Sequence, residues 1–224
     1  MIEEFAAFIP ESLKSKSGSV FYSGRNAFNS QSDVYILGLN PGGSADEQAN
    51  ETIAWHTEQV LYHKPADWSE YQDERWMGKA PGTHGLQPRV LHLFRQLNYN
   101  PQWVPASNLV FLRTAREHDL KGKFEELATA SWPFHQNVIS RLCIKTVLCF
   151  GKSSGQWVCN KLGATTKIGE FVENNKRQWK SSAYANKQQI SVIVATHPSI
   201  ADWCNQATDP TPLIQQVILG SKII

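Results

Sequence analysis

Short apolar runs alternate with longer amphipathic stretches along the chain. Three runs are short and mostly apolar, which is typical of strands buried on both faces of a sheet: Val34–Leu37, Thr146–Phe150 and Ile190–Ala195. A fourth strand is expected within residues 103–112, where the apolar pattern alone favours Leu109–Leu112 and puts Asn108 at its start. Glycine or polar residues follow each of the three clear runs, so each strand has a defined carboxyl end.

Apolar residues recur at helical spacing between these runs. Helices are expected at residues 2–14 (where Pro10 can open a second short helix), 46–62, 85–98, 133–142 (with Pro133 in the first turn), from Lys152-Ser153-Ser154 onward, and 210–219. Residues 165–186 are polar and leave room for a short hairpin, whereas residues 113–130 are charged and either helical or irregular. Residues 15–32 are typical of a loop.

This alternation predicts an α/β fold, a three-layer α/β/α sandwich around a mainly parallel four-stranded central sheet. The 224 residues suit a single domain, residues 1–224, with an insertion at about residues 44–83. The insertion is polar and aromatic and has no clean period. Long loops inside a compact domain are often lids or binding loops. A decorative insertion is an equally good interpretation.

Polar side chains follow the predicted strands where each one ends. Asn40 lies in the Gly/Pro turn after the first strand, Lys152 and Ser153 follow Gly151, and His197 and Ser199 follow the last apolar run. Ser44-Ala45-Asp46-Glu47 has the pattern of a capping box that opens a helix. Parallel strands have their carboxyl ends on one rim, which is where open α/β sheets bind ligands. The sequence therefore predicts a site there.

Composition narrows the classes of function only slightly. The net charge of +2 gives no global basic field, so it neither supports nor excludes nucleic-acid binding. None of the four cysteines forms a C-x-x-C pair, so no metal or other cofactor is expected. The acidic start, without a signal-peptide pattern, and the absence of a membrane-length apolar run favour an intracellular, cytoplasmic monomer, or a nuclear one in a eukaryote.

Two short motifs then carry a family resemblance. Gly38-Leu39-Asn40-Pro41-Gly42 and His197-Pro198-Ser199 resemble motifs of the uracil-DNA glycosylase superfamily, nearest its single-strand-selective and mismatch-specific branches. Residues 107–113 and 147–151 resemble two further segments of that family. The resemblance covers roughly residues 33–43 and 84–200. It implies a DNA glycosylase that removes a deaminated base, most simply uracil, during base-excision repair of single- or double-stranded DNA.

The resemblance also implies residue roles. Asn40 would hold the attacking water, and His197 would donate a hydrogen bond to a carbonyl oxygen of the departing base. Asn108 would read the edge of a flipped base. Base or phosphate contacts would come from Gly38, Leu39, Gly42 and Ser199, and DNA contacts from Lys152, Ser153, Ile200 and Trp203, the last two in the loop that wedges into the duplex.

The sequence departs from the family pattern at two points. Ile200 stands where a proline usually follows His-Pro-Ser, and Ser44-Ala45-Asp46 replaces an aromatic that stacks on the base. Four aromatic residues of the insertion are candidates for that stacking role: Trp55, Trp68, Tyr71 and Trp76, with Trp76 preferred because it shortly precedes Gly82-Thr83-His84-Gly85. The resemblance also shifts the second strand to about residues 103–107, with Asn108 at its end.

Other interpretations of these residues stay open. A histidine after a buried strand is often structural, Asn108 can cap a turn, Ser199 can cap a helix, and Lys152 can be a solvated surface charge. One alternative function is a non-catalytic member that binds nucleic acid or a nucleotide. Another is a small-molecule hydrolase or transferase, which is disfavoured because the chain has neither a P-loop nor a G-x-S-x-G motif.

Overall fold

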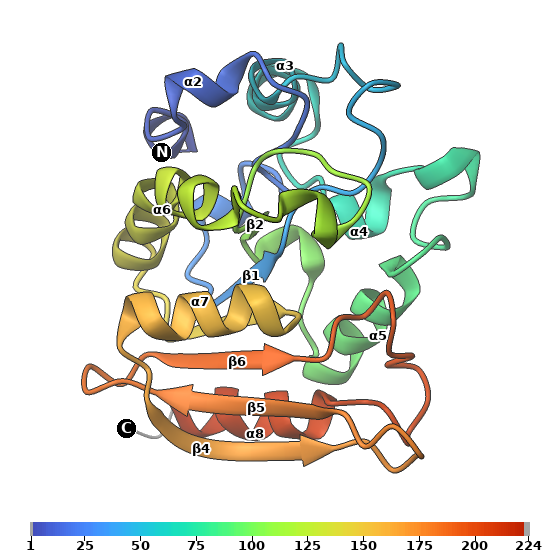
Figure 1. Cartoon of the computed structure of the whole chain (residues 1–224), viewed down its shortest axis with the longest axis vertical. Coiled ribbons are helices and arrows are strands. Elements are labelled where there is room, and N and C mark those ends of the chain that lie inside the picture. The colour runs from blue at the N-terminus through green and yellow to red at the C-terminus, as the bar shows by residue number, and fades with distance from the viewer. Residues whose placement is uncertain (1, 222–224) are drawn as a thin grey trace.

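The computed structural model describes residues 2–221 and is an α/β sandwich around one mixed sheet (Figure 1). The sheet has six strands in the order β2-β1-β3-β6-β5-β4. Their bounds are β1 Val34–Gly38, β2 Ala106–Asn108, β3 Thr146–Phe150, β4 Thr166–Val172, β5 Lys180–Ala185 and β6 Ser191–Ala195. Strands β2, β1, β3 and β6 are parallel to one another, whereas β5 runs antiparallel to both β6 and β4.

Helices cover both faces of the sheet. In Figure 1, α7 runs along β6, and α8 lies behind β5 and β4. The α-helices are α1 Ile2–Ala6, α2 Glu11–Lys14, α3 Ile53–Glu58, α4 Glu70–Asp73, α5 Gln87–Leu97, α6 Phe124–Arg141, α7 Lys152–Leu162 and α8 Thr211–Ser221. Shorter turns of helix are η1 Ala27–Asn29, η2 Gln59–His63 (a π-helix), η3 Trp76–Gly78, η4 Pro101–Trp103 and η5 Glu117–Leu120.

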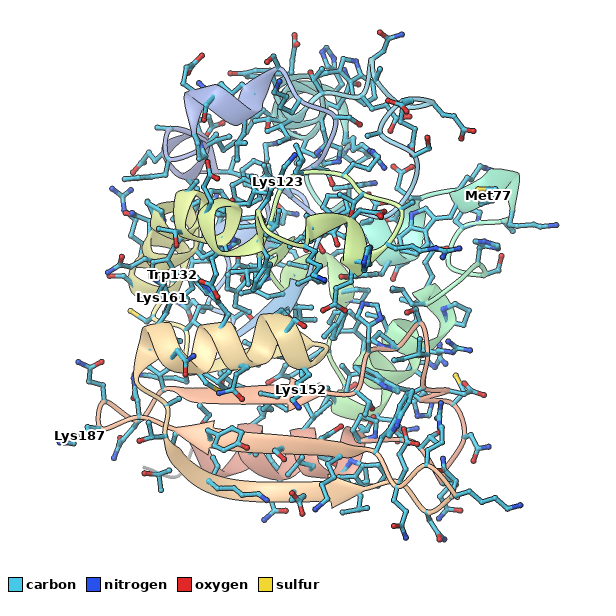
Figure 2. All side chains as sticks on the ribbon, viewed as in Figure 1. Met77, Lys123, Trp132, Lys152, Lys161 and Lys187 are labelled. Carbon is cyan, nitrogen blue, oxygen red and sulfur yellow. The ribbon has the colours of Figure 1, made fainter. Side chains whose placement is uncertain are left out.

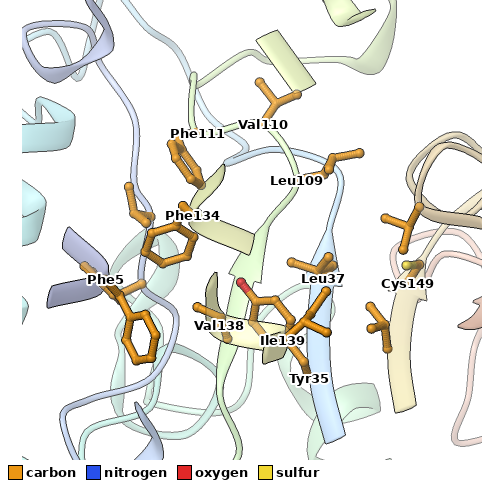
Figure 3. Packing of buried hydrophobic residues seen from close by; sticks show 14 of the residues in the cluster. Phe5, Tyr35, Leu37, Leu109, Val110, Phe111, Phe134, Val138, Ile139 and Cys149 are labelled. Carbon is orange, nitrogen blue, oxygen red and sulfur yellow. The ribbon is translucent and has the colours of Figure 1, made fainter. Parts of the chain in front are cut away.

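The alternation of side chains along the parallel strands divides the core between the two faces. Tyr35 and Leu37 of β1 pack with α6 and α7, while Val34 and Ile36 pack with α5 and α8. Figure 3 shows the first cluster, in which Phe5, Phe111 and Phe134 extend the core away from the sheet. Strands that are buried on both faces read as continuous apolar runs, which is why the sequence pattern located them.

The sheet is wider than predicted. Three of the four parallel strands, β1, β3 and β6, fall on the predicted apolar runs, and the hairpin for which residues 165–186 left room forms as β4 and β5. That hairpin adds two strands to the sheet edge, so the predicted count of four was wrong. Most residues of β4 are exposed or half-buried, and such a strand carries no continuous apolar run.

The second strand also differs from the one that the apolar pattern favoured. Residues Leu109–Leu112 are buried or half-buried but lie beyond β2, and Asn108 ends the strand. Their peptide groups leave the sheet and follow the turn after β1, because Leu109 N–H donates to Gly38 O and Val110 N–H to Leu39 O, both at 2.9 Å. Burial in the cluster around Phe111, rather than strand pairing, explains their apolar character.

Two predicted helices have different bounds. Residues 46–52 form turns instead of the start of a helix, and Ser44 caps only one turn, through its contact with Glu47 N–H at 3.3 Å. The helix begins after Thr52, whose hydroxyl accepts from Trp55 N–H at 3.1 Å. In α6 the helix starts nine residues before Pro133, because Ala128 and the residues around it already bury an apolar face.

The N-terminal segment covers the free edge of β2. Isolated bridges join Gly18 to Leu112 and Phe21 to Ser107, and Tyr22 N–H donates to Ala106 O at 2.9 Å. The buried Ser107 hydroxyl donates to Val20 O at 2.6 Å. This segment, predicted as loop, therefore continues the sheet by single bridges, runs antiparallel to β2 and places Tyr22 beside Ala106, the first residue of that strand.

Candidate functional site

A cavity of about 1080 Å³ opens at the carboxyl ends of the parallel strands. Its walls come from the turns after β1, β2, β3 and β6, from the insertion and from the β4–β5 hairpin. Asn40, Asn108 and His197 all line it, so the three residues that carry the proposed chemistry share one space although they are far apart in sequence. This is the rim on which the sequence predicted that polar groups would converge.

The Asn40 side chain is fixed through its nitrogen. The Nδ2 group donates to Pro41 O at 2.9 Å, to Thr114 Oγ1 at 2.9 Å and, more weakly, to Leu112 O at 3.4 Å. Acceptors on this side assign the amide orientation, because a carbonyl oxygen there would face other oxygens. The Oδ1 atom makes no hydrogen bond to the described residues, so it is left as an acceptor for a ligand or water.

His197 is held as a neutral ring with a defined tautomer. Its Nδ1 accepts from Ser199 N–H at 3.1 Å and lies 2.7 Å from Ser199 Oγ. Because a backbone N–H only donates, Nδ1 carries no proton and the ring proton resides on Nε2. Burial lowers the pKa of His197 to about 4, and the nearby Glu117 opposes this shift only in part. At neutral pH the ring is therefore an uncharged N–H donor.

Asn108 is the clearest sign of an absent partner. Its side chain is 4 % exposed, and its Nδ2 is buried without a hydrogen bond of good geometry among the described residues, although the Tyr22 hydroxyl lies within the influence of this side chain. Buried polar groups are nearly always paired, so an unpaired amide that lines a cavity points to a ligand carrying an acceptor. Gly38 makes room for this side chain, because a Cβ there would lie 2.1 Å from Asn108 Oδ1.

Aromatic rings form much of the cavity wall. Tyr22, Tyr71, Trp76 and Phe150 line it together, and Tyr71 lies edge-on to Phe150 with centroids 6.4 Å apart. The Trp76 indole N–H donates to Glu70 Oε1 at 2.6 Å, and burial raises the pKa of Glu70 to about 7. Among the four stacking candidates of the insertion, Tyr71 and Trp76 line the cavity.

The other two candidates lie elsewhere. Trp68 is buried and donates through its indole N–H to Glu74 Oε1 at 2.8 Å, while Trp55 is an exposed residue of α3 outside the cavity wall. The insertion is thus divided: its second half contributes to the site and its first half packs against the N-terminal segment.

The predicted backbone contacts lie around the turn after β1. Leu39 and Gly42 both line the cavity, and Gly42 has open space where a Cβ would be. Arg113 fixes this turn by donating to Gly42 O at 2.8 Å and to Glu51 Oε2 at 3.0 Å. Arg113 is buried, so it acts as a clamp between loops and not as a surface charge.

The predicted DNA contacts have mixed outcomes. Lys152, Ser153 and Ile200 line the cavity mouth, and Figure 2 shows Lys152 at the start of α7, above the carboxyl end of β6. The Ser153 hydroxyl, however, contacts the Glu117 carboxylate. Trp203 is fully buried and cannot enter a duplex from this position, so its predicted contact with DNA is wrong for this structure.

Trp203 instead supports the wall of the cavity from behind. Its indole N–H donates to Thr196 O at 3.2 Å, and its ring lies edge-on to Phe150 with centroids 5.3 Å apart. Phe150 in turn lies against the His197 ring. Arg89 of α5 fixes the same loop by donating to Pro198 O at 2.5 Å.

Several residues of the cavity were not expected from the sequence, among them Tyr22, Phe150 and Trp179. Phe150 could have been found, since it is the last residue of a predicted strand, directly before Gly151. Tyr22 and Trp179 gave no signal, because they lie in segments of loop-like or polar composition that only the fold brings to the rim.

Comparison with known proteins adds no assignment: no family model and no curated protein matches the chain. Within residues 2–221, no group of three or more His, Cys, Asp or Glu side chains is arranged to hold a metal ion. In the same part of the chain, no helix is both long and apolar enough to cross a membrane.

Proposed function

We propose that this protein is a DNA glycosylase that hydrolyses the N-glycosidic bond of a deaminated base, with uracil as the first candidate substrate. One observation carries the proposal. A fixed amide with a free oxygen (Asn40) and a neutral imidazole with its proton on Nε2 (His197) line the same cavity. Hydrolysis of a glycosidic bond needs these two functions: an acceptor that orients water and a donor for the leaving base.

The reaction can be followed atom by atom. The bond between C1′ of the sugar and the base nitrogen breaks, and its electron pair leaves with the base. Charge develops on a carbonyl oxygen of the base, where Nε2–H of His197 stabilises it without transferring its proton. A water held by Asn40 Oδ1 forms the new bond to C1′, and its surplus proton passes to solvent or to the departing base. Asn40 orients this water and is too weakly basic to take the proton.

The amide of Asn108 supports a deaminated base as the substrate. Asn108 lines the cavity, and its Nδ2 is a donor that, once turned to the cavity, favours a carbonyl oxygen such as O4 of uracil or O6 of hypoxanthine. The amino groups of cytosine and adenine are donors and would face this nitrogen unfavourably. Deamination converts those amino groups to carbonyls, which is the change that a donor at Asn108 would detect. The aromatic wall formed by Tyr22, Tyr71 and Trp76 supplies flat surfaces for a base.

The decisive assay uses end-labelled oligonucleotides that carry one uracil, hypoxanthine or xanthine, as single strands and as duplexes. Abasic sites are revealed by alkaline cleavage. We expect base release by the wild type and its loss in Asn40→Ala and His197→Ala. Exposed residues of the same types outside the cavity provide matched controls, Asn160→Ala and His63→Ala, which should keep full activity.

A wild-type protein that leaves all three bases in place would contradict the proposal. The second candidate is a non-catalytic protein that binds nucleic acid or a nucleotide. The segment after Gly42 favours it, because Ser44 caps a turn where the family resemblance implies an aromatic that stacks on the base. Binding of abasic or uracil-containing DNA without base release would identify that case.

A further inference from the structure

The tip of the β4–β5 hairpin carries an exposed tryptophan beside the cavity. Trp179 directly precedes β5 and is 38 % exposed, and both it and Lys180 line the cavity wall. Figure 1 shows that the β4–β5 turn and the segment after β6 lie at the same end of the sheet. The proposed chemistry uses neither Trp179 nor Lys180, although both lie in the same cavity as His197.

The tryptophan is held on a rigid support. The Arg177 guanidinium stacks on the indole at 4.1 Å from the ring centroid, donates to Ile200 O at 2.9 Å and pairs with Glu173 Oε2 at 3.0 Å. The Glu173 side chain is fully buried, so the carboxylate that pairs with Arg177 is fixed in place. A second link to the loop after β6 comes from Asn174 N–H, which donates to Ala207 O at 2.8 Å. The hairpin tip is therefore joined to the loop that follows His197. A ring held on one face by a guanidinium can still stack a flat group on its other face.

We infer that Trp179 is a stacking platform for the nucleotide next to the excised base on the same DNA strand. This inference rests on the function proposed above. A strand that delivers one base into the cavity must lay its neighbouring nucleotides on the rim, and the rim here carries Trp179, Lys180 and the exposed Ile200. Aromatic stacking with a nearby cation is how single-stranded nucleic acid is held without reading its sequence.

The surroundings of Trp179 favour a nucleotide over a protein partner. Among the described residues that line the cavity, only Trp179 and Ile200 are large, apolar and exposed, and the exposed Val172 lies next to them, paired with Lys180 across the hairpin. Three side chains are too small an apolar surface for a stable protein interface. They suit a single base and its sugar. Lys180, beside the ring, can meet a phosphate, while its contact with Glu170 at 3.3 Å keeps it at the rim.

The test is binding of a single-stranded oligonucleotide that contains one tetrahydrofuran abasic analogue, measured by fluorescence anisotropy. The tetrahydrofuran residue carries no base and therefore no glycosidic bond at the target position, so binding is read separately from base release. We expect Trp179→Ala to weaken binding about tenfold or more, as removal of a stacking aromatic does. Trp179→Phe should keep most of the affinity. Trp103→Ala, at an exposed tryptophan outside the cavity, should bind as the wild type does.

One further variant protects the test against misfolding. If Trp179→Ala lowers the melting temperature, Trp179→Leu replaces it, since leucine keeps apolar volume without a ring. Wild-type affinity in the folded variant that lacks a ring would overturn the inference, and so would a wild-type protein with no affinity for the probe. If no base is released but binding still depends on Trp179, the proposed enzymatic activity fails and the stacking inference stands.

Discussion

At the scale of single residues, hydrogen bonds to neighbouring atoms decide what each catalytic candidate can do. Asn40 Nδ2 is surrounded by three oxygen acceptors, two of them backbone carbonyls. His197 Nδ1 likewise has a fixed partner, because it accepts a hydrogen bond from Ser199 N–H. Each side chain is thus fixed at one end, and its other end is turned to the cavity. The site depends on orientation, and chemically similar substitutions should be damaging.

Asn40→Asp tests this point. The carboxylate keeps an oxygen for water but puts a second oxygen against Pro41 O, Leu112 O and Thr114 Oγ1, where two carbonyls cannot donate in return. We expect the rate of uracil release to fall about 100-fold, the usual effect of misplacing one catalytic group. Single-turnover kinetics measure it, with Thr114→Ala as the milder control. A rate equal to the wild type would show that the amide nitrogen is dispensable.

The state of His197 predicts a pH dependence. Its pKa of about 4 lies below the ordinary value of 6.5, so the ring stays neutral at neutral pH and takes up a proton only as pH falls toward 4. The contribution of His197 to the rate should be constant between about pH 5 and 8. An NMR titration of the ring, alongside the pH–rate profile, checks this. A ring that titrates near its ordinary value would refute the neutral-donor assignment.

Sequence reasoning found the residues that follow strands but not those that loops deliver. Asn40 and His197 follow continuous apolar runs, which makes their position at a strand end readable. Asn108 was ambiguous, because the buried loop after it is as apolar as a strand. Tyr22, Arg113 and Trp179 owe their positions to contacts between distant segments, and no local pattern records such contacts.

At the scale of elements, helix α5 holds the loop that carries His197. Arg89 donates to Pro198 O at 2.5 Å and lies 3.4 Å from Asp202 Oδ1. Arg89 itself is outside the cavity wall, so it positions the loop without touching a ligand.

The parallel strands could be predicted because both of their faces are buried. The β4–β5 edge was underestimated because its polar, half-exposed strands lack that signature.

Arg89→Ala should therefore lower the rate of base release several-fold while leaving the fold intact. The loop would lose its anchor, and His197 would gain exposure, which moves its pKa back toward the ordinary value. The measurement pairs kcat with the NMR titration of His197. Arg95→Ala, an exposed arginine of the same helix, is the control. Unchanged kcat and pKa in Arg89→Ala would show that the loop holds itself.

Gly38→Ala tests the packing of β1 against β2. The new Cβ would lie 2.1 Å from Asn108 Oδ1, so Asn108 must rotate away or the two strands must separate. We expect a loss of about 1–3 kcal/mol in unfolding free energy, as for other overpacked cores, together with weaker base recognition. Urea unfolding and binding of the abasic probe measure the two effects. Gly42→Ala, where a Cβ meets open space, should leave the unfolding free energy nearly unchanged.

At the scale of the whole molecule, buried ionisable groups link stability to pH. Burial lowers the pKa of His56 and His135 to about 3, below the ordinary 6.5. Below pH 6.5 the histidines of the unfolded chain therefore bind protons while those of the native state stay neutral. The unfolding free energy consequently decreases as the pH decreases. Glu70 acts in the opposite direction, because its native pKa of about 7 lies above the ordinary 4.5. As the pH falls through 7 the native state binds a proton at Glu70 before the unfolded chain does, which raises the unfolding free energy.

Unfolding free energy should consequently decline as the pH falls from neutrality toward 4. Each buried histidine lowers the unfolding free energy by up to about 1.4 kcal/mol for each unit that the pH falls. Glu70 raises it by a similar amount per unit, so it cancels the effect of about one histidine. Urea unfolding at several pH values measures the slope. The Glu70→Gln variant should steepen it by removing the opposing group. A slope of the reverse sign, or a shallower one in that variant, would contradict the assignment of neutral histidines.

The N-terminal segment that bridges β2 has a further consequence. A chain shortened to begin at β1 would leave the outer peptide groups of β2 open to any extended strand that meets them, including the same strand of another copy. It would also lack Tyr22, and hence one side of the cavity. Trimming this protein at its beginning should thus yield self-associating, inactive material, so the segment is both a guard against aggregation and a part of the binding surface.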